Sequence, residues 1–239
     1  MKLSPDERNR LFMVVSYCRS GTHMIRSALS QHPQVTCWGE IFIPDNFPKH
    51  SWPLDVAPAA HIRNVVLDSG KRRVGFCIQG YPKGSPVTKH WPDIWKEFKG
   101  FRLIIRLHRR NLFERAVSHW FMRVGRLGHA YCQEEVDTIC KYPARRIPLW
   151  WFRQDFPRTL RDRQIIDRLF PRALHVYYED FVKDMQGTMT LVQRFLEVEP
   201  MVLEPQSMKP PLTMREQVLN YDQIKQAYAE TRYAEFFTE

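Results

Sequence analysis

The stretch "LFMVVSYCRSGTHMIRSALSQHP", residues 11–33, contains the pattern that decides the fold. Its opening run, 11–15, is apolar and short, which is typical of a buried strand, whereas 21–31 is typical of a helix. The polar link between them predicts a tight loop that leads directly from strand to helix. Because the first backbone N–H groups of a helix have no intrahelical partner, the stretch indicates an anion-binding site.

Consecutive residues at the end of this link suit an anionic ligand. Arg19 supplies a permanent charge with several donors, Ser20 and Thr22 supply hydroxyls, and Gly21 lets a ligand approach the backbone closely. His23 is expected beside them. The alternative is an ordinary helix cap, since Ser and Gly commonly precede helices. A Walker loop is excluded, because the lysine and the first glycine of G-x-x-x-x-G-K-[ST] are absent.

Further apolar runs follow along the chain, each short enough for a buried strand. Helical stretches lie between most of them, and this alternation predicts an α/β protein with a central parallel sheet flanked by helices. Ligands of such sheets bind beyond the carboxyl ends of the strands. The predicted strands are 11–15, 35–38, 74–78, 101–107 and 173–178.

The chain of 239 residues is expected to form one domain. The segment 44–60 is rich in proline and predicts a long loop or lid. The segment 126–160 is an aromatic and arginine-rich insertion whose rings either pack in the core or line an acceptor pocket. The segment 197–239 carries several prolines before a helical ending, 215–230.

The composition favours a basic protein of a reducing compartment. Lysine and arginine number 36 against 26 acidic residues, a formal charge of +10, which suits an anionic partner or a solvated basic surface. The five cysteines form no C-x-x-C pair, so no disulfide framework is expected. His129, Cys132 and Cys140 do not match a common zinc spacing, and no metal is expected. The polar N-terminus predicts no signal peptide or membrane span, and a cytoplasmic location is expected.

A second polar cluster follows the strand 101–107. Asn111, with Glu114 three residues later, is typical of a helix start, and the apolar stripe of that helix extends to Val124. Ser118 lies off the stripe and can share an anion with Arg110. An NTPase would place a magnesium-binding acid at such a strand end, so the arginines here indicate a phosphate bound without a metal.

A third cluster follows the run 173–178. Tyr178 is expected at the strand end, where it can flank a planar base. Glu179 and Asp180 either start the next helix or, in the case of Asp180, stand where a Walker-B acid would. A P-loop kinase that requires magnesium is therefore one alternative function.

Together these motifs resemble the sulfotransferases that use 3′-phosphoadenosine 5′-phosphosulfate (PAPS). "RSGT", 19–22, resembles the 5′-phosphosulfate loop of that family, and "RRN-(x6)-S", which ends at Ser118, resembles its 3′-phosphate element. "YYEDFVKDMQGTMTLVQRFLEV", 177–198, is similar to its last strand and helix. The stretches most like the bacterial nodulation and trehalose-glycolipid sulfotransferases are "RSGTHM", "HPQVTCWGEIF", "SHWFMRVG" and "NYDQIKQAYAETRYAEFF".

The resemblance implies a three-layer, P-loop-like fold and a transfer of the sulfuryl group from PAPS to a hydroxyl or amine. The acceptor would be a carbohydrate or small molecule, the product would be 3′,5′-adenosine bisphosphate (PAP), and no metal would be needed. Arg110 and Ser118 would hold the 3′-phosphate, with Lys209 closing over it and Arg215 as a weaker choice. Dimers occur among the enzymes it resembles, so a homodimer is an expected alternative to a monomer.

The resemblance also implies a general base, for which there are two candidates. Glu40, in "CWGEIF", stands just past the second strand, where the bacterial enzymes place a carboxylate. His90, in "TKHWP", resembles a histidine of the cytosolic enzymes. The closer match of the bacterial subfamily favours Glu40. Cys77 departs from the pattern, because related sequences often carry lysine there, and Lys83 or Lys89 would have to replace it.

Two further alternatives do not involve sulfuryl transfer. The positive charge and the arginines interleaved with aromatic residues in 142–163 also suit a nucleic-acid-binding protein, whose affinity would fall steeply with salt. A sulfotransferase fold that binds nucleotide without catalysis is the other alternative.

Overall fold

The computed structural model describes residues 2–42, 56–79, 91–98, 100–125, 130–204, 206 and 210–237. The chain divides into two compact units. The first comprises Met1–His108 with Ile165–Pro205, and the second comprises Arg109–Gln164 with Gln206–Glu239. The expectation of a single domain over residues 1–239 stays a prediction.

The first unit contains a parallel sheet with the strand order β2-β3-β1-β4-β5. All the predicted strands are confirmed, with ends that differ from the prediction by at most two residues. The chain leaves β1 toward β2 and β3 on one side, and then crosses to β4 and β5 on the other. The carboxyl ends of β1 and β4 therefore flank the crevice at which such sheets bind ligands. The strands are β1 (Leu11–Ser16), β2 (Val35–Glu40), β3 (Arg73–Gln79), β4 (Leu103–His108) and β5 (Leu174–Tyr177).

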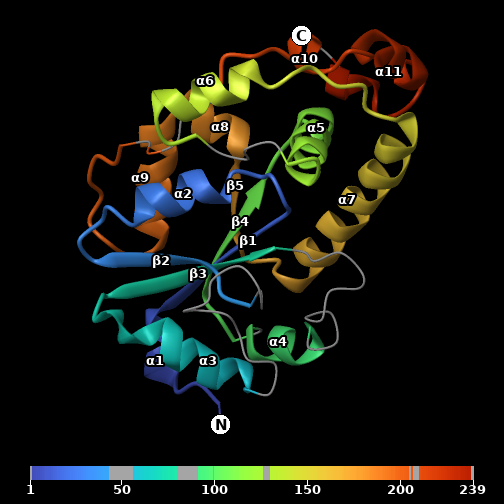
Figure 1. Ribbon diagram of the computed structural model, residues 1–239. Helices are drawn as coiled ribbons and strands as arrows, with labels where there is room; N and C mark the ends of the chain where they lie inside the picture. Colours follow the sequence, from blue (N-terminus) through green and yellow to red (C-terminus); the bar gives the residue numbers. More distant parts are fainter. Residues whose placement is uncertain are drawn as a thin grey trace. The chain divides into compact units, whose positions relative to one another are not determined.

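Side chains that alternate along β1 enter two separate cores. Leu11, Met13 and Val15 belong to one core, and Phe12 and Val14 belong to the other. Because both faces of β1 are buried, its sequence is a continuous apolar run. Helices α3 (Pro58–Val65) and α4 (Trp91–Phe98) cover the first face, and α2 (Thr22–Leu29) and α9 (Met185–Phe195) cover the second (Figure 1). The three-layer α/β architecture predicted from the sequence is thus confirmed.

The second unit is helical and has an aromatic core. Trp151 and Phe152 of the predicted insertion are buried in this core, whereas Trp150 is 51% exposed. Val124 was expected on the apolar stripe of α5 but is exposed, because it is the C-cap residue beyond the last helical turn. The helices are α5 (Leu112–Arg123), α6 (Gln133–Lys141), α10 (Met214–Gln217), α11 (Tyr221–Tyr228), the 3-10 turn Ala234–Phe237, and α7 (Leu149–Leu169), whose end belongs to the first unit.

The helical ending 215–230 is interrupted rather than continuous. Between α10 and α11, the Asn220 side chain accepts a hydrogen bond from the Ile147 N–H and donates one to the Ile147 carbonyl. Arg145 also pairs with Val218 through a β-bridge. These contacts hold residues 218–220 against residues 145–147 and interrupt the helix. Two short helices therefore form where the sequence predicts one.

The remaining elements of the first unit flank the sheet. They are α1 (Pro5–Arg10), the 3-10 turn Leu67–Ser69 and α8 (Tyr178–Lys183).

Candidate functional site

The link between β1 and α2 has a constrained backbone. Arg19, with φ 68°, and Gly21, with φ 93°, are both in the left-handed region and flank Ser20. The Ser20 N–H donates to the Tyr17 carbonyl at 3.3 Å. Left-handed residues within a tight turn direct neighbouring N–H groups into a concavity that binds anions. A left-handed residue other than glycine costs about 1–3 kcal/mol, a strain that clusters at functional sites. The backbone therefore supports the predicted anion loop.

Gly21 lies directly beneath the ring of Tyr178. A Cβ atom at position 21 would stand 2.7 Å from Cδ2 of Tyr178, which is closer than real contacts allow. Tyr178 was expected at the end of a strand, but the strand ends at Tyr177 and Tyr178 begins α8. Gly21 is the N-cap of α2 and makes no side-chain cap bond. The glycine N-cap considered from the sequence as the alternative is thus present, without a side-chain hydrogen bond to the first turn of the helix.

Two buried hydroxyls mark the same loop. Ser16, at the end of β1, is 0% exposed, and Ser20 is 1% exposed. Within the residues that the structure describes, neither Oγ has a hydrogen-bond partner. A buried polar atom left this way costs about 1–3 kcal/mol, so both hydroxyls fit a site that is completed by a ligand with acceptor oxygens. Thr22, at the first position of α2, is also buried. Ser16 was not predicted as a site residue, although a polar residue at the end of an apolar run is a signal for such a position.

Positive charge surrounds the start of α2. Nη2 of Arg26 lies 3.4 Å from Nδ1 of His23. The pKa of His23 is lowered to about 4, first by burial and then by the charges of Arg26 and Arg19. His23 is therefore neutral at pH 7, and the field at the loop is positive. Arg26 was not predicted as a site residue, although it stands one turn after His23 on the same helix.

Glu40 lies at the same edge of the sheet, as the last residue of β2 rather than just past it. The register with β3 shifts between Trp38 and Glu40, so that Glu40 faces Cys77. Such irregularities re-aim side chains and are frequent next to active sites. The pKa of the buried Cys77 thiol is raised, first by its hydrogen bond with Cys37, then by burial, and also by the charge of Glu40. Position 77 thus holds a neutral thiol beside Glu40, not a cation.

The second unit holds the predicted 3′-phosphate residues. Asn111 is the N-cap of α5, and its Oδ1 accepts a hydrogen bond from the Glu114 N–H at 3.0 Å, as the sequence predicted. Arg110, just before this cap, is exposed, and Ser118 is half-buried on α5. Arg109 is different, because it is buried and paired with Glu114 at 2.8 Å. Of the two arginines, Arg110 is the one accessible to a ligand.

Arg215 lies in α10 of the same unit. It pairs with Asp222 at 2.6 Å, and its guanidinium stands 4.6 Å from the ring centroid of Tyr221. Several predicted residues fall outside the described residues: His90, Lys209, Lys83, Lys89 and the part 44–55 of the proline-rich segment.

Cys132 and Cys140 are too far apart to bind one zinc ion together, as the zinc site considered from the sequence would require. Cys132 is the N-cap of α6 and Cys140 lies in its last turn. At about 1.5 Å of rise per residue, their backbones stand roughly 12 Å apart along the helix. His129 lies outside the described residues.

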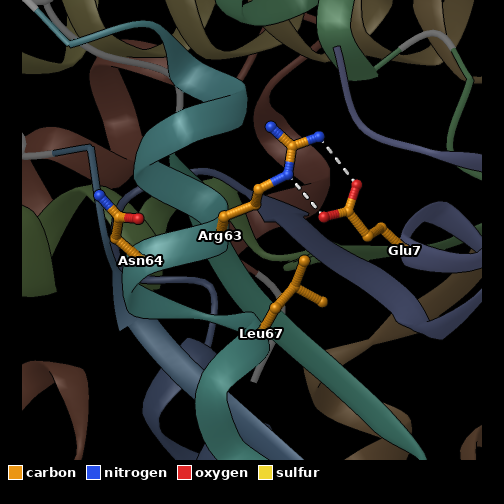
Figure 2. A pocket seen from close by; sticks show the side chains of 4 residues that line it. All are labelled: Glu7, Arg63, Asn64 and Leu67. Atoms are coloured by element: carbon orange, nitrogen blue, oxygen red, sulfur yellow. Dashed lines mark hydrogen bonds and ion pairs between the residues drawn. The ribbon is translucent and has the colours of Figure 1, made fainter. Parts of the chain in front are cut away.

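A pocket in the first unit is lined by Glu7, Arg63, Asn64 and Leu67 and includes no predicted site residue (Figure 2). Nε and Nη2 of Arg63 donate to the two carboxylate oxygens of Glu7 at 2.5 and 2.9 Å. The hydrogen bonds from Arg63 and from the Ser4 N–H lower the pKa of Glu7 to about 2. The two opposite charges compensate one another, so this pocket is a weaker candidate than the β1–α2 loop.

Solved structures provide an independent comparison of the fold. The crystal structure of a sulfotransferase from Alicyclobacillus acidocaldarius matches 95% of this chain and 92% of that chain, with a TM-score of 0.53 and 17% sequence identity. The two chains share their fold.

A mouse sulfotransferase, SULT7A1, complexed with PAP, matches 97% of this chain and 76% of that chain, with a TM-score of 0.43 and 16% identity. No protein-family model matches the sequence, and no curated protein matches it. Among the described residues, no helix is both long and apolar enough to cross a membrane.

Proposed function

We propose that the protein is a sulfotransferase that moves the sulfuryl group of PAPS to a hydroxyl or amine of a carbohydrate or small-molecule acceptor. The observation that carries the proposal is the β1–α2 loop, in which two left-handed residues flank a buried serine. The ordered resemblance of the motifs to PAPS-dependent enzymes supports the same assignment, and the shared fold is compatible with it.

The β1–α2 loop is assigned to the 5′-phosphosulfate. The acceptor atom attacks sulfur, the bond from sulfur to the phosphate oxygen breaks, and PAP departs with increased negative charge on its 5′-phosphate. Arg19, Thr22 and the N–H groups at the start of α2 would stabilise that charge, and the hydroxyls of Ser16 and Ser20 would donate to the ligand. Donors held in place before the reaction contribute most of the stabilisation of such charge.

The acceptor must also lose a proton, for which Glu40 and His90 are the candidates. Glu40 stands at the carboxyl edge of the sheet from which the loop extends. A carboxylate within hydrogen-bond reach of the acceptor hydroxyl can accept its proton. Replacing Glu40 by Gln retains the shape of the side chain and removes the base. If Glu40 is the base, turnover falls by about 10²–10⁴ while PAP binding is unchanged, and the equivalent loss in His90→Ala would assign the role to His90.

The nucleotide half of PAPS is assigned to further residues. Arg110 and Ser118 would bind the 3′-phosphate, and Lys209, with Arg215, would close over it. Tyr178 packs on Gly21 and would border the nucleotide. This chemistry uses positioning and charge rather than a metal, and PAP should therefore bind without magnesium.

Calorimetric titration with PAP in magnesium-free buffer tests the proposal, with ATP titrated in parallel. We expect PAP to bind more tightly than ATP, and both Arg19→Ala and Arg110→Ala to weaken PAP binding. Arg172→Ala is the matched control, because it removes an equal charge from an exposed position before β5, at the amino edge of the sheet. Failure of the folded protein to bind PAP would exclude a sulfotransferase. Magnesium-dependent ATP binding would favour a kinase instead.

A further inference from the structure

A cluster of metal-ligating side chains lies in the first unit and includes none of the residues assigned to PAPS, although His108 stands two residues before Arg110. His108, Asp167 and His175 come from β4, α7 and β5, and their ligand atoms all lie within 4.8 Å of one another. We propose that these side chains bind a divalent transition-metal ion such as Zn²⁺. The inference stands independently of the proposed function, since it involves none of the residues assigned to PAPS or to the acceptor.

The sheet register brings the two imidazoles together. Arg106 is opposite His175, and His108 is opposite Tyr177, so these alternate residues share one face of the sheet. Nε2 of His108 and Nδ1 of His175 are 2.8 Å apart in a hydrogen bond, and the planes of the two rings are nearly parallel, at 13°. Two nitrogens bound to one zinc at about 2.0–2.1 Å stand roughly 3.3 Å apart in a tetrahedron. The two nitrogens must therefore separate by about half an ångström, and the rings must turn so that both lone pairs point at the ion.

Ring packing limits how far His108 can move. Its ring stacks on Tyr177, with centroids 5.0 Å apart and an interplanar angle of 22°, and His108 is buried. His175 is exposed and Asp167 is half-buried. The cluster thus has one fixed ligand, one partly fixed ligand and one ligand reached directly from solvent, which supplies the entry path that a metal site requires.

The charges around the cluster determine which metal ions it can bind. Oδ1 of Asp167 accepts a hydrogen bond from Nε of Arg106 at 3.1 Å, and Arg106 is 0% exposed. A carboxylate has several lone pairs and can serve this donor and a metal together. Because the Arg106 charge offsets that of Asp167, the site lacks the excess of carboxylates that Mg²⁺ and Ca²⁺ need. Two imidazoles and one carboxylate instead suit Zn²⁺, Co²⁺ or Ni²⁺.

Occupation of the cluster would join the end of α7 to β4 and β5. With three protein ligands the ion would keep one position for water or another ligand. Its effect should be seen first in stability, since a metal that binds the folded state alone raises the unfolding temperature.

Calorimetric titration of the tag-free, metal-free full chain with Zn²⁺ tests the site, supported by the visible absorption of bound Co²⁺. We expect one Zn²⁺ per chain, no competition by excess Mg²⁺, and affinity reduced about tenfold or more in His175→Gln. Asp167→Asn, which retains an oxygen acceptor for Arg106, should weaken binding as well. Zn²⁺ should also raise the unfolding temperature of the wild type, and should raise that of His175→Gln and Asp167→Asn by less.

His119→Gln is the matched control. His119 lies 3.4 Å from a carboxylate, Asp155, in the second unit, but among the described residues no third ligand group joins this pair. This control should bind Zn²⁺ as the wild type does. Absence of saturable Zn²⁺ binding by the folded wild type would overturn the proposal. So would wild-type affinity in both His175→Gln and Asp167→Asn, or loss of the ion in a Cys132→Ser, Cys140→Ser variant instead.

Discussion

At the scale of single residues, Gly21 is constrained both by its backbone and by its surroundings. Its φ of 93° disfavours any side chain, and a Cβ would meet the Tyr178 ring at 2.7 Å. We expect Gly21→Ala to destabilise the fold by more than the roughly 1–2 kcal/mol that the left-handed conformation alone costs. It should also abolish PAP binding, because the loop must shift. Chemical denaturation and calorimetric titration measure the two effects.

Gly70 provides the control for this prediction. Its φ is 66°, and a Cβ there would meet nothing within 4 Å, so Gly70→Ala reports the backbone cost alone. PAP binding should be retained in Gly70→Ala. If both alanine variants lose equal stability and both bind PAP normally, the contact between Gly21 and Tyr178 has no part in shaping the site.

His23 should make the stability of the protein depend on pH. Its pKa is about 4 in the folded chain, below its ordinary value of 6.5. Between these values the unfolded chain binds a proton that the folded chain does not, so the free energy of unfolding decreases as the pH falls from 6.5 toward 4. His23→Gln should flatten this dependence above pH 4.5, where carboxylates contribute least. Urea denaturation over a pH series provides the measurement.

Ligand binding should shift the same group in the opposite direction. A phosphate bound near His23 stabilises its protonated form, so PAP should raise the pKa of His23. A histidine-resolved NMR titration with and without PAP measures the change. An unchanged His23 pKa at saturating PAP would place the nucleotide away from the start of α2.

At the scale of elements, one charged network joins α5 to α7 within the second unit. Arg115 and His119 of α5 both contact Asp155 of α7, and Arg115 and Asp155 are buried. Burial raises the pKa of Asp155, but the hydrogen bond from His119 and the charge of Arg115 lower it more, so the net shift is downward. Asp155→Asn would leave the Arg115 charge buried without its carboxylate. We expect a loss of about 3–5 kcal/mol in the free energy of unfolding.

Asp222→Asn is the comparison for that prediction. Asp222 also pairs with an arginine, Arg215, but its side chain is 75% exposed. Water screens such pairs, so this substitution should leave the stability nearly unchanged. Equal losses in the two variants, measured by denaturant unfolding, would mean that burial does not control the strength of these ion pairs.

The sequence predicts elements well where the signal is local. The apolar runs locate all five strands, and Asn111 with Glu114 locates the start of α5, because each depends on neighbouring residues. The strand order and the partners of Arg106 could not be predicted. That arginine is fully buried in β4, with Tyr17 and Asp167 as partners from other elements. Such pairings depend on tertiary contacts that have no local pattern.

The candidate site was predicted to a similar extent. Arg19 to His23 lie together in the loop and the first turn of α2, as the strand–loop–helix pattern indicates, and Tyr178 packs against Gly21. Ser16 and Arg26 were missed because a strand end and a helix surface give no signal without their neighbours. The meeting of His108 with His175 is likewise set by the register of β4 and β5, which single strands do not specify.

At the scale of the whole molecule, the formal charge of +10 attracts any polyanion, so binding of an anion is not by itself evidence of a PAPS site. The salt dependence of binding separates the two cases. Nonspecific binding to DNA releases a counterion for nearly every phosphate contacted, and its affinity falls by about 10³–10⁵ between 50 and 200 mM salt when 6–10 phosphates are contacted. PAP carries few charges, and its binding should weaken much less.

Stabilisation by the ligand provides the second measurement. Saturation with PAP at 100 times its dissociation constant should raise the free energy of unfolding by about 2.7 kcal/mol, because PAP binds the folded state alone. Arg19→Ala should remove this gain at the same PAP concentration, and Arg172→Ala should retain it. A steep salt slope for PAP, or equal stabilisation by PAP in both variants, would show that the basic surface as a whole binds the nucleotide and that the β1–α2 loop is not its site.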